Sequence, residues 1–238
     1  MQSVAFLIAV FKFVILIFSI SVHECAHAWT ASRLGDQTAR MQGRVTLNPA
    51  NHVDPIGTLL FPGLVIFGPL LIGFSFFSVL IGWGKPTPVI TRNFRRIVRD
   101  DNMTTLAGPA SNLLLVFVAF VVLGLISAFV QGGHDVVIAA FHRQIITLDP
   151  LTAFVLLAVL AVEINLTLFF FNLLPIPPLD GSRLLRNLLP YNAVLAYDRI
   201  PIWVSYLFMI LIGGTLIRFL VGPAEELVYV ALALVPGR

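Results

Sequence analysis

Apolar residues follow one another in long runs along this chain, instead of alternating with polar residues as they do in half-buried helices and strands. Four such runs cover residues 4–30, 104–131, 151–173 and 201–221. A helix needs about 20 apolar residues to cross the ~30 Å hydrocarbon core of a bilayer, and each run is that long. The pattern predicts an all-α polytopic membrane protein with about four transmembrane helices.

Basic residues gather in three of the segments that connect these runs. They are Arg33, Arg40 and Arg44 in the first, Lys85, Arg92, Arg95, Arg96 and Arg99 in the second, and Arg183, Arg186 and Arg199 in the third. The segment 132–150 carries only Arg143. Because cytoplasmic loops are enriched in Lys and Arg, we expect the three basic segments in the cytosol and the N-terminus outside.

A fifth apolar stretch, residues 56–82, joins two segments that this charge pattern places on the same side. A single crossing would put these two segments on opposite sides of the membrane, so the stretch cannot be one spanning helix if both are cytosolic. If it folds in two, each arm of about 13 residues is roughly 20 Å long as a helix, which is too short for the core. We predict a re-entrant hydrophobic hairpin that turns near Gly68-Pro69. The alternative is a plain spanning helix with one basic segment outside.

Two shorter stretches complete the pattern. Residues 40–53 contain the β-prone run Val45-Thr46-Leu47 and predict a short membrane-associated β segment, with an extended loop as the alternative. The apolar stretch after Pro223 begins with Glu225 and Glu226 and predicts an interfacial helix. We expect a single membrane-embedded domain over residues 1–238, with a core of about residues 1–185 and an extra C-terminal helix at 201–221.

Composition narrows the class of protein. The chain is 58% hydrophobic and 11% charged, whereas a soluble domain carries roughly a quarter charged residues. Its net charge of +3 is small, and the basic residues lie between apolar runs, which fits a membrane surface better than nucleic acid. We expect the lipid bilayer as a partner and no nucleic acid, and the oligomeric state is left open. The single cysteine, Cys25, cannot form a disulfide within the chain.

The candidate chemistry begins with His23-Glu24-Cys25-Ala26-His27 near the end of the first apolar run. Metal-binding groups inside a membrane helix are costly and usually functional. Because residues four apart share a helix face, His23 and His27 can bind one metal ion, with Glu24 beside it as a base. A catalytic zinc usually has three protein ligands. Asp180, expected at a similar depth where a new helix opens, is the candidate for the third, and a plain helix cap is the alternative.

These motifs resemble the site-2 protease family of intramembrane zinc metalloproteases. The resemblance rests on His23-Glu24-x-x-His27 and on the downstream pattern Asn172-x-x-Pro175-x-Pro177-x-Leu179-Asp180-Gly181. Three further segments agree with family patterns: Gly108-Pro-Ala-Ser-Asn112, the stretch from Gly43 to Gly57, and Gly82-Trp-Gly-Lys-Pro86-Thr-Pro88. Together they cover most of residues 15–185. No PDZ-like or other regulatory domain is recognised, so we expect the compact form.

The resemblance implies one zinc ion held by His23, His27 and Asp180, with Glu24 as the catalytic base. It implies an endopeptidase that cuts a transmembrane or membrane-anchored protein in or near its transmembrane segment. With the charge pattern, it places the active site in the cell membrane, toward the cytosolic side.

Four further residues are candidates for contacts with the substrate. Asn172 and Asn112 could bind the substrate backbone or its oxyanion, and hydrogen bonds between helices are the alternative. Val45 and Leu47 would offer a strand edge to the unwound substrate.

Two other functions fit part of the pattern. A catalytically idle zinc-binding regulator or chaperone would not need Glu24, and a metal transporter would line a path across the membrane with ionisable groups. Here those groups converge near one depth, apart from Lys12 and Glu163. We interpret these two as structural, either paired with each other or with Lys12 extended outward.

His52 and Asp54 are candidates for supporting a ligand histidine, and a turn role is the alternative for Asp54.

Overall fold

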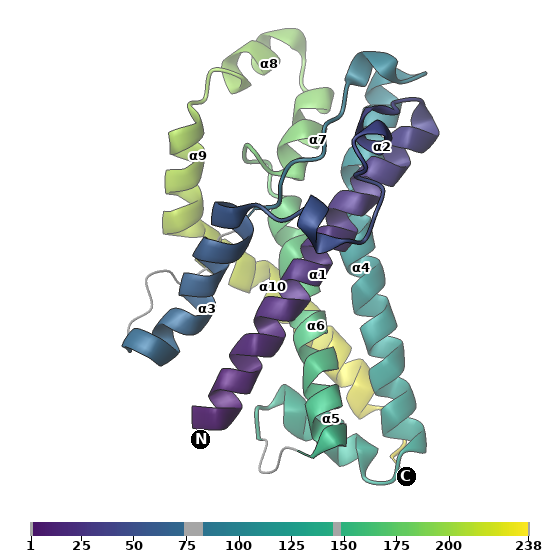
Figure 1. Cartoon of the computed structure of the whole chain (residues 1–238), viewed down its shortest axis with the longest axis vertical. Helices are drawn as coiled ribbons and strands as arrows, with labels where there is room; N and C mark the ends of the chain where they lie inside the picture. The colour runs from purple at the N-terminus through teal and green to yellow at the C-terminus, as the bar shows by residue number, and fades with distance from the viewer. Residues whose placement is uncertain (1, 74–82, 145–148, 238) are drawn as a thin grey trace.

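The computed structural model describes residues 2–73, 83–144 and 149–237, and helices dominate those residues (Figure 1). The longer helices are α1 (Gln2–Leu34), α3 (Phe61–Ile72), α4 (Ile97–Phe129), α5 (Gly133–Phe141), α6 (Pro150–Asn172), α7 (Asp180–Leu188), α8 (Tyr191–Tyr197), α9 (Ile202–Phe208) and α10 (Gly214–Ala233). A short helix, α2 (Thr38–Met41), follows α1, and single 3-10 turns lie at Pro49–Asn51 and Thr91–Asn93. π-helical turns at Pro55–Leu60 and Met209–Gly213 lead into α3 and α10.

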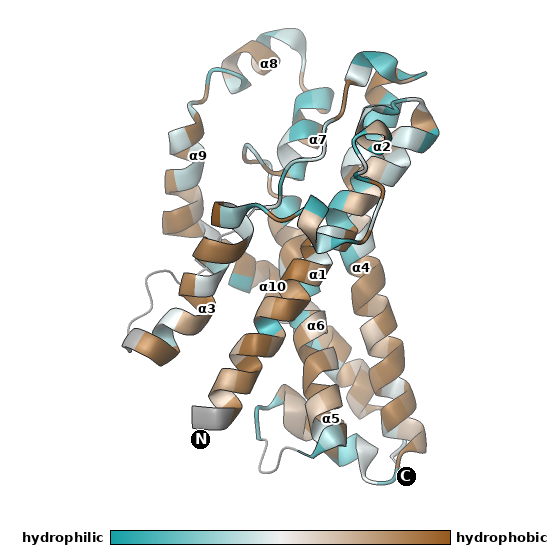
Figure 2. Ribbon diagram, viewed as in Figure 1, coloured by the Kyte–Doolittle hydropathy of each residue, from teal (hydrophilic) through white to brown (hydrophobic). Residues whose placement is uncertain are grey.

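Four helical segments are long and apolar enough to cross a membrane: Val4–Leu34, Ile97–Phe129, Pro150–Asn172 and Ile202–Ala233. They confirm the predicted all-α polytopic class and the four predicted spanning helices. The segments that carry α2, α7 and α8 lie at one end of the molecule, while both termini and α5 lie at the other (Figure 1). Apolar residues dominate the helices between these two ends (Figure 2).

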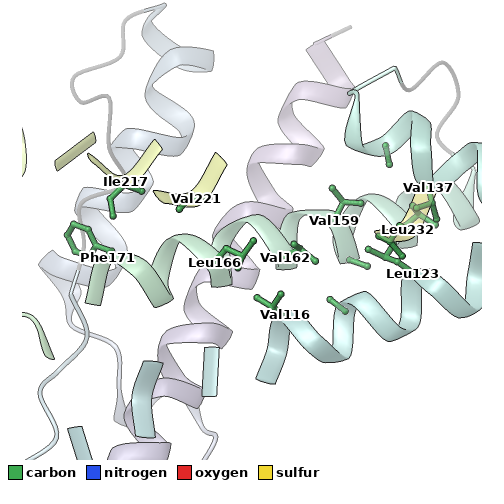
Figure 3. Packing of buried hydrophobic residues seen from close by; sticks show 14 of the residues in the cluster. Val116, Leu123, Val137, Val159, Val162, Leu166, Phe171, Ile217, Val221 and Leu232 are labelled. Atoms are coloured by element: carbon green, nitrogen blue, oxygen red, sulfur yellow. The ribbon is translucent and has the colours of Figure 1, made fainter. Parts of the chain in front are cut away.

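The helices α1, α4 and α6 pack against one another, and α5 and α10 cover α6. The buried core lies between α4, α5, α6 and α10, with Leu123, Val137, Val159 and Leu232 fully buried in it (Figure 3). Because lipid tails are as apolar as these side chains, close packing between helices, more than exclusion of water, stabilises such a core.

The start and end of α6 follow from local sequence. The Asp149 side chain accepts a hydrogen bond of 3.0 Å from the backbone N–H of Thr152 and caps the helix, with Pro150 in its first turn. Hydrogen bonds from Thr152 lower the pKa of the Asp149 carboxyl below its ordinary value. The helix ends at Asn172, three residues before Pro175. This ending sets the chain on the path that brings Asp180 back toward α1.

The predicted β segment at 40–53 is wrong, because these residues form α2, turns and a 3-10 turn, without a strand. Two side chains explain the difference. Asn48 accepts a hydrogen bond from the backbone N–H of Ala50, and Asp54 accepts from those of Ile56 and Gly57. Each cap starts a helical turn, and this local chemistry outweighs the β propensity of the run at 45–47.

The predicted turn near Gly68-Pro69 is also wrong. The helix α3 passes through both residues and ends at Ile72, where Gly73 caps it with a left-handed φ of 68°. Proline is tolerated inside membrane helices because neighbouring groups satisfy the freed backbone carbonyl. The return arm of the predicted hairpin, residues 74–82, lies outside the described residues, so a re-entrant path stays a prediction.

Two further expectations are corrected. The stretch after Pro223 does not form a separate interfacial helix, because α10 runs through Pro223 to Ala233 as part of the fourth candidate span. Glu163 does not pair with Lys12 but forms an ion pair with Arg143, which follows α5. Lys12 has no ion-pair partner within 4 Å in the described part of the chain.

Candidate active site

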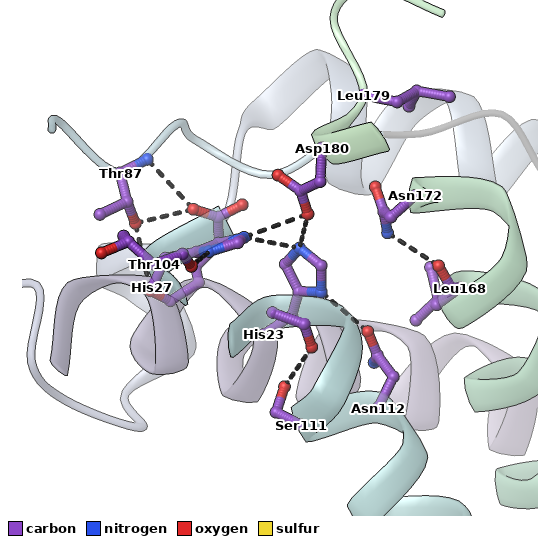
Figure 4. Close-up of polar contacts among 12 residues, drawn as sticks. His23, His27, Thr87, Thr104, Ser111, Asn112, Leu168, Asn172, Leu179 and Asp180 are labelled. Atoms are coloured by element: carbon purple, nitrogen blue, oxygen red, sulfur yellow. Dashed lines mark hydrogen bonds and ion pairs between the residues drawn. The ribbon is translucent and has the colours of Figure 1, made fainter. Parts of the chain in front are cut away.

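The structure brings the three predicted metal ligands together at the meeting point of α1, α4 and α7 (Figure 4). His23 and His27 lie one turn apart on α1, and their Nε2 atoms are 3.0 Å apart. Asp180, the first residue of α7, places Oδ2 3.1 Å from Nε2 of His23 and 3.2 Å from Nε2 of His27. Both histidines are more than nine-tenths buried.

The other ring nitrogen of each histidine has a fixed role. Nδ1 of His27 lies 2.7 Å from the backbone carbonyl of Thr104, which can only accept, so this nitrogen carries the proton. Nδ1 of His23 lies 2.7 Å from Oδ1 of Asn112. A second amide, that of Asn165, settles the orientation of Asn112.

The two asparagines form a chain that ends on a backbone carbonyl. Nδ2 of Asn165 donates to the carbonyl of Ala161 at 2.9 Å, so its Oδ1 faces Asn112 and accepts from Nδ2 of that residue, also at 2.9 Å. Oδ1 of Asn112 is thereby turned toward His23 and accepts the proton of Nδ1. Both asparagines are almost fully buried. Hydrogen bonds of this kind fix the tautomer of a metal-binding histidine.

When both imidazoles are neutral, three electron-pair donors therefore face one another. With both Nδ1 atoms protonated, each neutral imidazole presents a lone pair at Nε2 to Oδ2 of Asp180. This oxygen is buried and has no hydrogen-bond donor in the described part of the chain. A divalent cation fits this arrangement, because it satisfies all three atoms.

Gly108 allows α4 to approach the two histidines closely. A Cβ at this position would overlap Nε2 of His27 and lie 2.6 Å from Cε1 of His23. Only glycine leaves that space open at this point of α4.

The helix α7 is fixed to α4 by polar contacts one and two turns after Asp180. Arg183 forms an ion pair of 2.5 Å with Asp101, and Asn187 donates to the other oxygen of Asp101 at 2.8 Å. Asp101 is buried near the start of α4. Gly181 is required as well, because a Cβ there would overlap the backbone carbonyl of Leu173. These contacts hold Asp180 beside the histidines.

Glu24 is held by the segment that precedes α4. Its Oε2 accepts hydrogen bonds from the backbone N–H of Thr87 at 3.1 Å and from the Thr87 hydroxyl at 2.7 Å. Glu24 and His23 line a small hollow of about 50 Å³, together with Ile20, Trp83, Gly84, Leu168, Phe171 and Asn172. A reacting group in this hollow would therefore meet Glu24 and His23, one of the three candidate ligands.

The candidate substrate residues differ in their positions. Asn172 lines the hollow beside Glu24, and its Nδ2 donates to the backbone carbonyl of Leu168 at 2.9 Å. The Asn112 amide is occupied by His23 and Asn165, so its contacts favour an orienting role over substrate binding. Val45 and Leu47 do not line this hollow, and no strand edge supports their predicted role.

The other histidines and Asp54 form hydrogen bonds to groups other than the ligand histidines. Nε2 of His52 lies 2.8 Å from the backbone carbonyl of Thr46, and Asp54 caps the turn at Pro55–Leu60, so the turn role of Asp54 is confirmed. His134 and His142 bond to Ser127 and Tyr229.

Sequence reasoning did not find four residues that the site uses: Thr87, Thr104, Asn165 and Arg183. Thr104 acts through its backbone, which carries no signal in the sequence. Asn165 is a polar residue within a predicted spanning helix, and this position could have identified it.

Comparison with known proteins identifies the family. The profile of Peptidase family M50 matches residues 96–214, which include Gly108, Asn112 and Asp180. The chain is 41% identical over 175 residues to "Putative zinc metalloprotease YwhC" of Bacillus subtilis (strain 168), covering 74% of this chain and 67% of that protein.

Mycobacterial relatives are more distant. "Putative zinc metalloprotease Rip2" of Mycolicibacterium smegmatis is 34% identical over 164 residues, and its Mycobacterium tuberculosis counterpart is 30% identical. The match covers 68% of this chain but about half of each Rip2 protein. No solved structure matches the chain. The profile match and the similarity to YwhC confirm the predicted resemblance, and the chain belongs to peptidase family M50, the site-2 protease family.

Proposed function

We propose that this chain is a zinc-dependent intramembrane endopeptidase whose metal is held by His23, His27 and Asp180. The observation that carries the proposal is the convergence of Nε2 of His23, Nε2 of His27 and Oδ2 of Asp180, which lie 3.0 to 3.2 Å from one another. The relatives named as zinc metalloproteases support zinc as the metal. When bound, zinc supplies a Lewis acid that makes water acidic and polarises a peptide carbonyl.

Glu24 is the general base in this proposal. It follows His23 directly in the sequence and lines the same hollow, and two hydrogen bonds from Thr87 hold its carboxylate in place. Glu24 removes a proton from the attacking water and then delivers it to the leaving amide nitrogen. A carboxylate that is already oriented loses little freedom in doing so.

Asn172 is the candidate donor to the substrate. Its hydrogen bond to the backbone carbonyl of Leu168 uses only one of its two N–H groups. The other N–H can donate to the carbonyl oxygen of the bond being cut, where negative charge develops. Removal of such a donor typically lowers kcat by about 100- to 1,000-fold.

The substrate in this proposal is a transmembrane or membrane-anchored protein. His23 and Glu24 belong to the candidate span Val4–Leu34, so a peptide bond reaches them most directly from within the membrane. A transmembrane segment must unwind there, and its freed backbone groups need polar partners. The basic segments next to α2, α4 and α7 support an orientation with the site toward the cytosol.

The test is cleavage of single-span model substrates by the purified chain and by Glu24→Gln, with zinc content measured on both. Wild type is expected to cleave and Glu24→Gln to lose at least about 1,000-fold in rate, since the base is removed, while both keep one zinc per chain. Glu226→Gln, an exposed glutamate on α10, is the matched control and should cleave like wild type. Cleavage by Glu24→Gln at the wild-type rate would overturn the role of Glu24. Zinc-loaded wild type that cleaves no membrane substrate would favour the idle regulator.

A further inference from the structure

A second hollow, of about 480 Å³, lies among α1, α3, α6 and α10, away from the metal ligands. We call it the Lys12 hollow. Its lining is apolar except for Thr167 and four ionisable residues that all belong to candidate membrane spans: Lys12, Glu163, Arg218 and Glu225. Ionisable groups at such positions are costly, and they mark functional sites by default.

The charges in the Lys12 hollow do not balance. Glu163 is neutralised by its ion pair with Arg143. Lys12, Arg218 and Glu225 have no ion-pair partner within 4 Å among the residues that the structure describes. Two cations therefore face one carboxylate, which leaves one net positive charge. In a medium of low dielectric constant, a further carboxylate would bind favourably here.

The Lys12 hollow and the hollow beside Glu24 lie along the same two helices. Residues 5, 8, 9 and 12 of α1 line the first, and residues 20, 23 and 24 line the second. On α6, residues 163, 164 and 167 line the first, and residues 168, 171 and 172 line the second. Residues three, four or eight apart share a helix face, so each helix uses one side for both hollows. A long ligand lying along α1 and α6 would contact both.

The separation of the hollows fits a transmembrane helix. From Lys12 to Glu24, α1 rises roughly 18 Å, and from Glu163 to Asn172, α6 rises roughly 14 Å, at 1.5 Å per residue. A helical substrate covers that distance in about 9 to 12 residues.

We propose that the Lys12 hollow is a specificity subsite, which binds an acidic side chain of the transmembrane substrate about 9 to 12 residues away from the bond that is cut, toward the α5 end of the molecule. This inference rests on the proposed function, since it concerns the substrate of the same active site. It replaces the structural interpretation of Lys12. A substrate carboxylate brings the charge of the hollow to zero, and Leu at the same place leaves it positive.

The test measures binding, so it does not depend on cleavage. The probes are fluorescent single-span peptides of about 25 residues, built of Leu and Ala, with one Asp, Asn, Lys or Leu moved through the segment. Binding is measured to the Glu24→Gln chain in nanodiscs. We expect Asp at the matching positions to bind about tenfold more tightly than Leu or Asn, and Lys to bind least, with the favourable positions recurring every three or four residues.

Two variants assign the effect to the hollow. Arg218→Leu should bring the Asp-to-Leu ratio of affinities toward one, and Lys12→Glu should reverse the preference from Asp to Lys. The Asp-to-Leu ratio compares two peptides on the same variant, so a change in the folded fraction of that variant does not alter it. Equal affinity for Asp and Leu peptides at every position, or no binding of either, overturns the subsite. Cleavage of the same peptides by wild type tests the protease separately, so a subsite without protease activity and a protease without this subsite are distinguishable.

Discussion

Two buried asparagines determine which nitrogen of His23 is free to bind a metal. The chain from the Ala161 carbonyl through Asn165 and Asn112 leaves Nδ1 of His23 protonated and Nε2 with a lone pair. Replacing Asn112 or Asn165 with Ala should weaken zinc affinity by about 10- to 100-fold, because such partners fix the ligand. Chelator competition measures this affinity. Asn172→Ala is the control and should keep it, since the amide of Asn172 donates to Leu168 and bonds to no ligand among the residues that the structure describes. Equal zinc affinity in all three variants would contradict the orienting role.

Gly108 gives a second prediction at the residue scale. Gly108→Ala places a methyl group against both ligand histidines, and such overpacking costs about 1 to 3 kcal/mol, or about 5- to 150-fold in zinc affinity. Gly124→Ala on the same helix is the control, because its Cβ would lie 3.9 Å from Leu232. Zinc titration of both purified variants is the measurement. Similar zinc affinity in both variants would show that α4 does not need the glycine.

Sequence patterns were enough to choose His23, His27 and Asp180 as candidate ligands, because helical spacing and the depth of each run are local properties. The partner of Asn112 was not predictable in the same way. It depends on which helices lie side by side, and a polar residue in a spanning helix carries no record of its neighbour. Val45 and Leu47 were assigned from β propensity, which the caps at Asn48 and Asp54 outweigh.

At the scale of elements, α7 carries Asp180 and depends on α4 for its position. Arg183→Gln removes the ion pair to Asp101 and leaves a buried carboxylate with less compensation. We expect zinc affinity to fall about tenfold, as for other residues that position a ligand. Arg186 lies on the same helix and forms a largely exposed ion pair with Asp198, the residue after α8, so Arg186→Gln should leave zinc affinity unchanged. The double variant Asp101→Arg, Arg183→Asp exchanges the two charges, and it should recover part of the zinc affinity that Arg183→Gln loses. Equal losses in the Arg183 and Arg186 variants would show that α7 is merely destabilised.

The spanning helices were predictable from hydropathy alone, because lipid demands a long apolar run whatever the neighbours are. The path of α3 was not, since Gly68-Pro69 reads as a turn in water but is accommodated within a membrane helix. The continuation of α10 through Pro223 is a similar case.

For the whole molecule, the fold places all three basic segments at one end and α5 at the other (Figure 1). The positive-inside rule then puts the basic end in the cytosol. In a Cys25→Ala background, Thr91→Cys should react with a membrane-impermeant thiol reagent only after the cells are opened, while Asp135→Cys, an exposed position on α5, should react in intact cells. The reverse labelling would place the active site toward the outside.

The most direct test of the central claim is X-ray absorption at the zinc edge on the purified Glu24→Gln chain. We predict one zinc per chain with two imidazoles and oxygen ligands at about 2.0–2.2 Å. Cys25, the single cysteine, lies within the His-Glu motif, so a sulfur ligand at about 2.3 Å could come only from that residue. A spectrum without sulfur that loses its imidazole signal in His23→Ala supports the site described here. A sulfur ligand, or zinc that does not bind in stoichiometric amount, would contradict it.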